Sequence, residues 1–142
     1  MRKPDLEELL KQKILILDGA MGTMIMRYNL TAEDYGGEAW EGCPEILAVT
    51  RPDVITSIHE AYLEAGADII ETNTFGSTSV VLAEYGLQDR AYEITAANAK
   101  LAVEAARKWS APDKPRYVAG AMGPTTKTLS VTGGITFEKL AD

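Results

Sequence analysis

ILILDGAMGT, residues 14–23, is an apolar run that passes directly into a polar turn with two glycines. The same pattern returns as ADIIETNTFG at residues 67–76 and as YVAGAMGPT at residues 117–125. A stretch with helical periodicity separates each run from the next, and repeated strand–loop–helix units are typical of α/β proteins with parallel strands. The pattern therefore predicts strands whose C-terminal ends open onto one face, which holds the active site in barrels built this way.

The clearest helix signal follows the first long loop. Thr50 and Asp53 have the spacing of a capping box, Pro52 suits a first helical turn, and Gly66 is a typical helix end. The irregular sequence at 28–47 predicts a long loop, which in a compact domain is usually functional or a lid. We further expect strands at 14–17, 68–72 and 117–121, and helices at 5–12, from Ser77 or Thr78 to 85, at 89–109, and from 136 onward.

Three strands leave two interpretations of the fold open. One is a small three-strand α/β domain, and the other is the N-terminal portion of a (β/α)8 TIM barrel, which needs roughly 250 residues in full. The sequence ends within a beginning helix, which favours the second interpretation. We therefore expect residues 1–142 to be a single partial domain, truncated at its C-terminus.

Composition excludes several classes of protein. The net charge of −7 argues against nucleic-acid or anionic-membrane partners, which require clustered Lys and Arg. The longest apolar runs are far shorter than the roughly 20 residues that span a bilayer, and no signal peptide is visible. The single cysteine, Cys43, excludes an internal disulfide and indicates a reducing compartment. The sequence thus predicts a cytoplasmic protein.

Polar side chains gather where the first two strands end. Side chains alternate along a strand, so Asp18 lies on the same face as Ile14 and Ile16. In the second strand, Glu71 and Asn73 lie on the same face as Ile69. Asp18, Glu71 and Asn73 should then converge at the mouth of the barrel, with Thr72, Thr74 and Thr125 in the adjoining loops. A carboxylate there suits a substrate ammonium, and amides and hydroxyls suit a carboxylate, so an amino-acid-like ligand fits. The alternative is that Asp18 and Asn73 only bond to turn backbone.

Other types of site find little support. His59 lies in a helix beside Ile55 and Tyr62, so we expect it to be packed there. Cys43 has no second cysteine or nearby histidine, whereas a zinc site needs three or four protein ligands. Gly19 and Gly22 lack the spacing of a dinucleotide fingerprint. Considered alone, the residues indicate binding of a small molecule and supply no catalytic group.

Several long motifs then resemble one known family. LDGAMGTM at 17–24, TRPDVI at 50–55, YLEAGADIIETNTF at 62–75 and GAMGPTTKTLS at 120–130 are similar, in order and spacing, to the start of the cobalamin-dependent methionine synthases. More broadly they resemble the homocysteine S-methyltransferase family, and the similarity runs from about residue 14 to the last residue.

The resemblance implies a (β/α)8 barrel that binds homocysteine at the C-terminal ends of its strands. In the family, zinc held by three cysteine thiolates activates the homocysteine sulfur, which attacks a methyl group carried by cobalamin in the cobalamin-dependent enzymes. Asp18 matches the aspartate near the substrate amino group, and the motifs at 72–75 and 123–125 match loops of the same pocket. The candidate substrate-binding residues are Asp18, Gly19, Glu71, Thr72, Asn73, Thr74, Gly123 and Thr125.

The chain departs from the family in its metal ligands. The zinc cysteines of the family lie in later strands, and Cys43 matches none of them, so we expect no zinc site and no methyl transfer by this piece alone. Folate, cobalamin and reactivation domains would be its partners in a full methionine synthase. A stand-alone, non-catalytic module that binds a small amino acid remains an alternative. An aldolase-type lyase is a third, with Lys127 as the nearest candidate lysine.

Overall fold

The computed structural model describes residues 5–129 and 133–141, so Ser130 of the last motif lies outside it. The strands are β1 (Ile69–Glu71) and β2 (Tyr117–Ala119). The α-helices are α1 (Leu6–Leu10), α2 (Met21–Met26), α3 (Ala32–Tyr35), α4 (Leu47–Thr50), α5 (Pro52–Ala65), α6 (Ser79–Leu82), α7 (Ala91–Trp109) and α8 (Phe137–Ala141). Short 3₁₀ turns lie at Glu38–Trp40, Pro44–Ile46, Ala83–Tyr85 and Gln88–Arg90.

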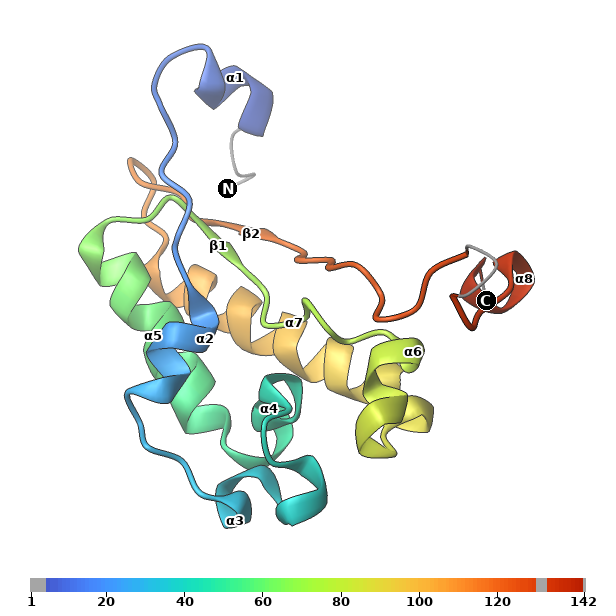
Figure 1. Cartoon of the computed structure of the whole chain (residues 1–142). Coiled ribbons are helices and arrows are strands. Elements are labelled where there is room, and N and C mark those ends of the chain that lie inside the picture. The colour runs from blue at the N-terminus through green and yellow to red at the C-terminus, as the bar shows by residue number, and fades with distance from the viewer. Residues whose placement is uncertain (1–4, 130–132, 142) are drawn as a thin grey trace.

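The two strands form a parallel sheet, as the repeated strand–helix pattern predicts. Ile69 is opposite Tyr117, and Glu71 is opposite Ala119. Helices α5 and α7 lie on the same side of both strands (Figure 1). The mixed α/β class is thus confirmed, whereas the N-terminal portion of a (β/α)8 barrel stays a prediction.

The predicted first strand, residues 14–17, is wrong as a full strand. Only Leu17 forms a parallel bridge, to Ile69, and the pairing is carried by hydrogen bonds such as that from Asp18 N to Ile69 O at 2.9 Å. The N–H of Ile16 donates to the Asp68 carboxylate at 3.0 Å and not to a backbone carbonyl. Ile14 is 86% exposed, so no packing holds the start of this segment in a ladder.

Helix α5 begins one residue later than the capping signal predicts. Arg51 is the N-cap, and Thr50 is the last residue of α4, where its hydroxyl bonds to Ile46 O at 3.4 Å. The predicted Thr50 cap is therefore wrong, because the preceding residues already form a helical turn that uses Thr50. The predicted C-terminal end is confirmed, since Gly66 adopts φ 115°, a left-handed conformation that glycine adopts without strain.

The other helix signals hold to within one or two residues. Thr78 caps α6 by accepting from Val81 N at 3.2 Å, which decides between Ser77 and Thr78. Gly86 ends the turn after α6 in the left-handed conformation. Helix α7 starts at Ala91, because Gln88–Arg90 form a 3₁₀ turn before it. Helix α2, by contrast, arises within a segment for which we expected no helix.

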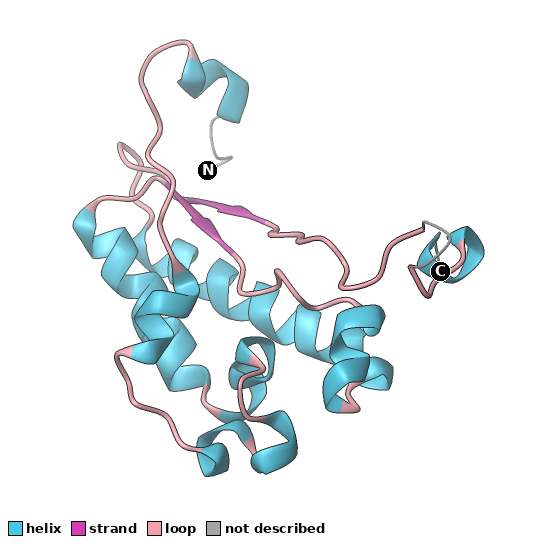
Figure 2. Cartoon of the chain, viewed as in Figure 1, coloured by secondary structure: helices cyan, strands magenta, loops and turns pink. Residues whose placement is uncertain are grey.

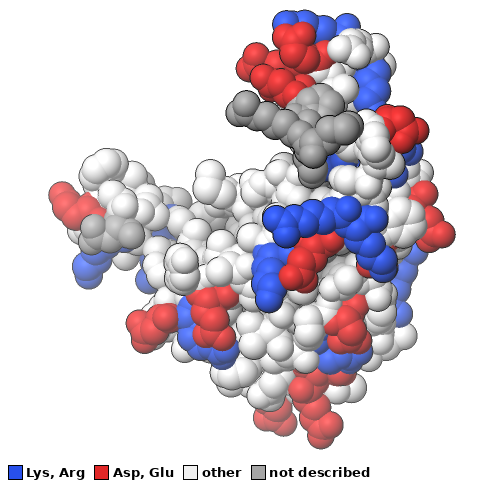
Figure 3. All heavy atoms as spheres, turned by 180° about the vertical axis from the view of Figure 1, so that it is seen from behind, with Lys and Arg blue, Asp and Glu red and all other residues white. Residues whose placement is uncertain are grey.

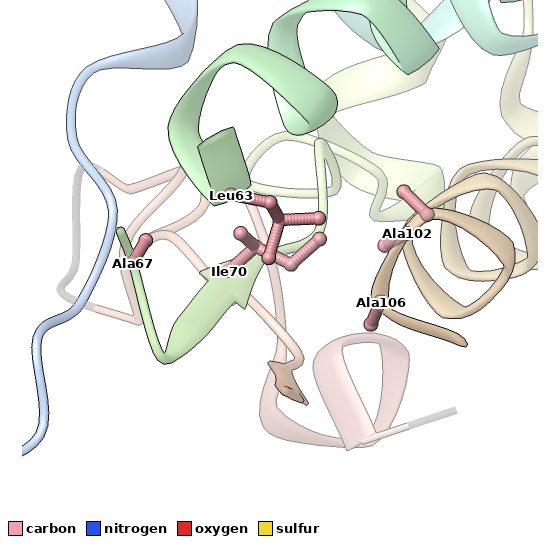
Figure 4. Close-up of a cluster of buried hydrophobic side chains, with 6 residues drawn as sticks. Leu63, Ala67, Ile70, Ala102 and Ala106 are labelled. Atoms are coloured by element: carbon pink, nitrogen blue, oxygen red, sulfur yellow. The ribbon is translucent and has the colours of Figure 1, made fainter. Parts of the chain in front are cut away.

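One cluster of apolar side chains joins the sheet to the helices behind it. Leu63 of α5, Ile70 of β1 and Ala102 and Ala106 of α7 meet there, together with Ala67 (Figure 4). Ile70 points toward the helices, so its strand neighbours Ile69 and Glu71 point to the opposite face. The face of β1 that carries Ile69 and Glu71 is therefore the one that α5 and α7 do not cover (Figure 2).

Residues 28–47, expected as a long irregular loop, contain several short helical turns. Cys43, Ile46 and Leu47 are completely buried, and Cys43 and Ile46 pack with Leu82 and Ile94 in a second cluster. Within this segment the buried part is thus Cys43 and residues 45–47, and the expectation that the segment is functional or a lid stays a prediction. Its position also brings Pro44 and Glu45 to the strand ends.

The surface offers no single-sign patch on the face seen in Figure 3, where acidic and basic side chains are intermixed. Ion pairs account for part of this mixture, such as Lys108 with Glu60 at 2.6 Å. Among residues 5–129 and 133–141, no helix combines the length and the apolar character needed to cross a membrane.

Candidate functional site

A pocket of about 440 Å³ lies at the C-terminal ends of the strands. Four separate parts of the chain build it: the turn into α2, the turn before α4, the end of β1 with the loop after it, and the segment after β2. The lining residues are Asp18, Gly19, Ala20, Met21, Gly22, Pro44, Glu45, Glu71, Thr72, Asn73, Phe75 and Ala121. The structure thus brings Asp18, Gly19, Glu71, Thr72 and Asn73 of the candidate set together in one pocket.

Asp18 is the central acidic side chain of this pocket. Its Oδ2 accepts a hydrogen bond from the backbone N–H of Glu71 at 3.0 Å. Its Oδ1 is buried and has no hydrogen-bond partner within the described ranges. A buried carboxylate oxygen without a donor is costly, so this atom is available for a donor that a ligand would bring.

Burial raises the pKa of the Asp18 carboxyl to about 6. The bond from the Glu71 N–H works against this shift, and the nearby Glu71 carboxylate adds to it. A cationic group in the pocket would reverse the balance, because it favours the charged form of Asp18. Asp18 is therefore charged at lower cost when a cationic group lies beside it.

Thr72 and Thr74 close a small hydrogen-bond network between the two strand ends. Thr74 Oγ1 donates to Ala121 O at 2.7 Å, so in the 2.6 Å contact of the two hydroxyls Thr72 is the donor. Thr72 Oγ1 also accepts from Ala121 N at 3.0 Å. Both hydroxyls are thus engaged with the protein, and their role in the pocket is to fix the loop after β1.

Asn73 is also engaged, because its Nδ2 donates to Pro44 O at 2.8 Å. The bond joins segments 29 residues apart and is not a local turn bond. Pro44 and Glu45 are pocket residues that the strand pattern did not reveal, because they come from the irregular segment before α4. Their only signal in the sequence was a carboxylate within the otherwise apolar stretch around Ile46 and Leu47.

The remaining candidates, Thr74, Gly123 and Thr125, do not line the pocket. Thr74 is buried behind it, as described above. Gly123 N donates to Phe75 O at 2.9 Å, and Gly123 lies against the Phe75 ring, where a Cβ would be 2.5 Å from a ring carbon. Thr125 Oγ1 donates to Lys127 O at 2.5 Å, which is a local turn contact. Gly123 therefore acts on the pocket through Phe75.

Cys43 and His59, the metal and nucleophile candidates of the sequence, are both buried. Within the described ranges, no group of three or more His, Cys, Asp or Glu side chains is arranged to hold a metal ion. Cys43 is buried, its thiol donates to Glu45 Oε2 at 3.7 Å, and burial raises its pKa to about 11, so it stays a neutral thiol. His59 is completely buried in α5, and burial lowers its pKa to about 4.

Comparisons with known proteins agree with this geometry. The sequence model described as "Homocysteine S-methyltransferase" matches residues 15–142. The oxidized form of the homocysteine methyltransferase MmuM from Escherichia coli has a similar structure, with 27% sequence identity, a TM-score of 0.69, and 84% of this chain and 40% of that chain covered. Its metallated form is similar as well, with 26% sequence identity, a TM-score of 0.67, and 84% of this chain and 41% of that chain covered. The chain therefore spans about two fifths of the solved relatives it matches.

Proposed function

Because the chain belongs to the homocysteine S-methyltransferase family, we propose that it forms part of the homocysteine pocket of a methyltransferase. The observation that carries this proposal is the pocket at the strand ends with Asp18 in its wall, whose buried Oδ1 has no hydrogen-bond partner among the described residues. The α-ammonium group of homocysteine would donate to that oxygen. Met21 and Phe75 supply apolar surface for its side chain.

The proposed reaction is transfer of a methyl group to sulfur. The homocysteine thiol loses its proton, and the sulfur attacks the methyl carbon of the donor. A sulfur–carbon bond forms while the bond between methyl and donor breaks, and the electron pair leaves with the donor. The residues of this chain would bind and orient the amino-acid end, which holds the sulfur in one direction for attack.

Methionine synthase, with methylcobalamin as donor, is the finer form of the proposal. It rests on the resemblance of the four motifs, and folate, cobalamin and reactivation domains would then be partners of this chain. Zinc would supply activation of the thiol in such an enzyme. The described residues do not fit a zinc site, since Cys43 is a buried neutral thiol and no cluster of ligands surrounds it. No step of the mechanism is therefore assigned to a metal here.

Isothermal titration of L-homocysteine into the purified chain, with and without zinc, tests the proposal after circular dichroism has verified folding. We expect binding of homocysteine and much weaker binding of 4-mercaptobutyrate, which lacks the amino group. Asp18→Ala should cost about 1.5–3 kcal/mol, the scale of a hydrogen bond to a charged group. Failure of the folded chain to bind homocysteine in either condition would overturn the proposal, and equal binding of the two ligands would remove Asp18 from it.

A further inference from the structure

Glu45 is a buried carboxylate at the edge of the pocket, and only 6% of the residue is exposed. Its Oε1 accepts a hydrogen bond from the backbone N–H of Gly76 at 2.8 Å. A Cβ on Gly76 would lie 2.7 Å from the same oxygen, so this approach requires glycine. A buried polar group of this kind is stable only where hydrogen-bond partners face it.

The backbone carbonyls of Pro44 and Glu45 also accept hydrogen bonds from other segments. Pro44 O accepts from Asn73 Nδ2 at 2.8 Å, and Glu45 O accepts from the fully buried Asn98 Nδ2 at 2.9 Å. Asn98 Nδ2 is shared with Ile94 O of its own helix at 2.9 Å. The turn before α4 is thus joined to the loop after β1 and to α7, although these segments are far apart in the sequence.

The two joined segments form opposite parts of one wall. Pro44 and Glu45 line the pocket from the turn before α4, and Asn73 and Phe75 line it from the loop after β1. Two bonds hold these parts together, from Gly76 N to Glu45 Oε1 and from Asn73 Nδ2 to Pro44 O, and only the first depends on a side chain of the turn. A change in that bond would therefore alter the shape of the pocket before it alters the rest of the fold.

We propose that Glu45 is a positioning residue for the ligand site: its carboxylate joins the loop after β1 to the turn before α4 and so sets the shape of the amino-acid pocket. The inference rests on the proposed function, since it concerns the same pocket. The bond from the Gly76 N–H requires an acceptor oxygen on the side chain of residue 45. A Gln side chain has such an oxygen and nearly the same shape as Glu. Ala removes the bond and leaves the Gly76 N–H buried without an acceptor.

Titration calorimetry with L-homocysteine on the full chain tests this, using Glu45→Ala, Glu45→Gln and the wild type. We expect Glu45→Ala to raise the dissociation constant at least tenfold and Glu45→Gln to change it less than threefold. Hydrogen exchange of the Gly76 amide supplies a second readout, with protection retained in Glu45→Gln and lost in Glu45→Ala. Gly76→Ala, which introduces the clash from the opposite side, should weaken binding in the same way.

Two control variants separate this role from a general loss of stability. Ala105→Gly should lower the melting temperature, because Ala105 belongs to the apolar cluster behind the sheet. Glu60→Gln removes a carboxylate that is paired with Lys108. Both variants should bind homocysteine as the wild type does. Wild-type affinity in Glu45→Ala would overturn the inference, as would equal loss in Glu45→Gln and Glu45→Ala. If the wild type itself does not bind homocysteine, the proposed function fails. The hydrogen-exchange readout still tests the link itself: unchanged protection of the Gly76 amide in Glu45→Ala would show that Glu45 does not hold this loop.

Discussion

Asp18 Oδ2 accepts a hydrogen bond from the backbone N–H of Glu71 at 3.0 Å, across 53 residues of sequence. This side chain joins the end of the first predicted strand to the end of β1 and lines the pocket, and its second oxygen, Oδ1, takes no part in that bond. That oxygen is buried and unpartnered within the described ranges, and burial raises the pKa of the carboxyl to about 6. The site is therefore set up at some cost to the free folded state.

This cost predicts that Asp18→Asn stabilises the protein at neutral pH. The unfolded pKa is 3.8, so between pH 3.8 and 6 the folded state binds more protons, and stability falls as the pH rises through that window. Above pH 6 the full penalty is present, which we place at about 1 kcal/mol after allowance for solvent screening. Urea unfolding of the wild type and Asp18→Asn from pH 4 to pH 8 measures this penalty. Equal stability of the two proteins at all pH values would contradict the prediction.

The same carboxyl predicts the pH dependence of ligand binding. An α-ammonium group requires the charged form of Asp18, so the affinity for L-homocysteine should rise from pH 5 to pH 7 and then level off while the amino group stays protonated. Calorimetric titrations across this range check the expectation. Asp18→Asn should bind weakly with little dependence on pH; a wild-type affinity that stays flat from pH 5 to pH 7 would argue against an ammonium at this oxygen.

Local signals predicted the helices well. Pro52, Gly66, Thr78 and Gly86 act within one turn of chain, so their effect on a helix end is visible without knowledge of the fold. The segment at 14–17 has equally clear apolar character but needs neighbours on its face and edges. Its pairing is reduced to a bridge at Leu17 because those neighbours are not supplied by the described residues.

The pocket residues also include some that local sequence patterns predict and some that they do not. Asp18 and Glu71 were predicted from their place at strand ends, since parallel strands bring those ends together. Glu45 was missed, because its place depends on how the irregular segment before α4 packs, and no periodic pattern encodes that. Thr72 and Thr74 were expected as ligand contacts, whereas their hydroxyls bond to each other and to Ala121.

The contact of Gly123 with Phe75 predicts a strong effect of Gly123→Ala. The new Cβ would lie 2.5 Å from a ring carbon and 2.7 Å from the carbonyl oxygen of Phe75, so the ring or the backbone must move. We expect a loss of about 1–3 kcal/mol in the free energy of unfolding, as for other overpacked sites, and weaker homocysteine binding. Gly120→Ala is the matched control, because its Cβ meets nothing within 4 Å. Equal unfolding curves for the two variants would show that the Phe75 loop yields freely.

His59 predicts a second pH effect, of opposite sign to that of Asp18. Burial lowers the pKa of this fully buried histidine from 6.5 to about 4, so between these values the unfolded state binds the proton and stability falls as the pH falls. At pH 5 the loss is about 2 kcal/mol by linkage. His59→Leu removes it, and unfolding in urea at pH 7 and pH 5 should show a smaller decrease for the variant than for the wild type. Since His59 is the sole histidine and Asp18 titrates in the same range, the comparison is cleanest in an Asp18→Asn background. There, an equal decrease with and without His59 would show that this histidine is already accessible to protons in the folded state.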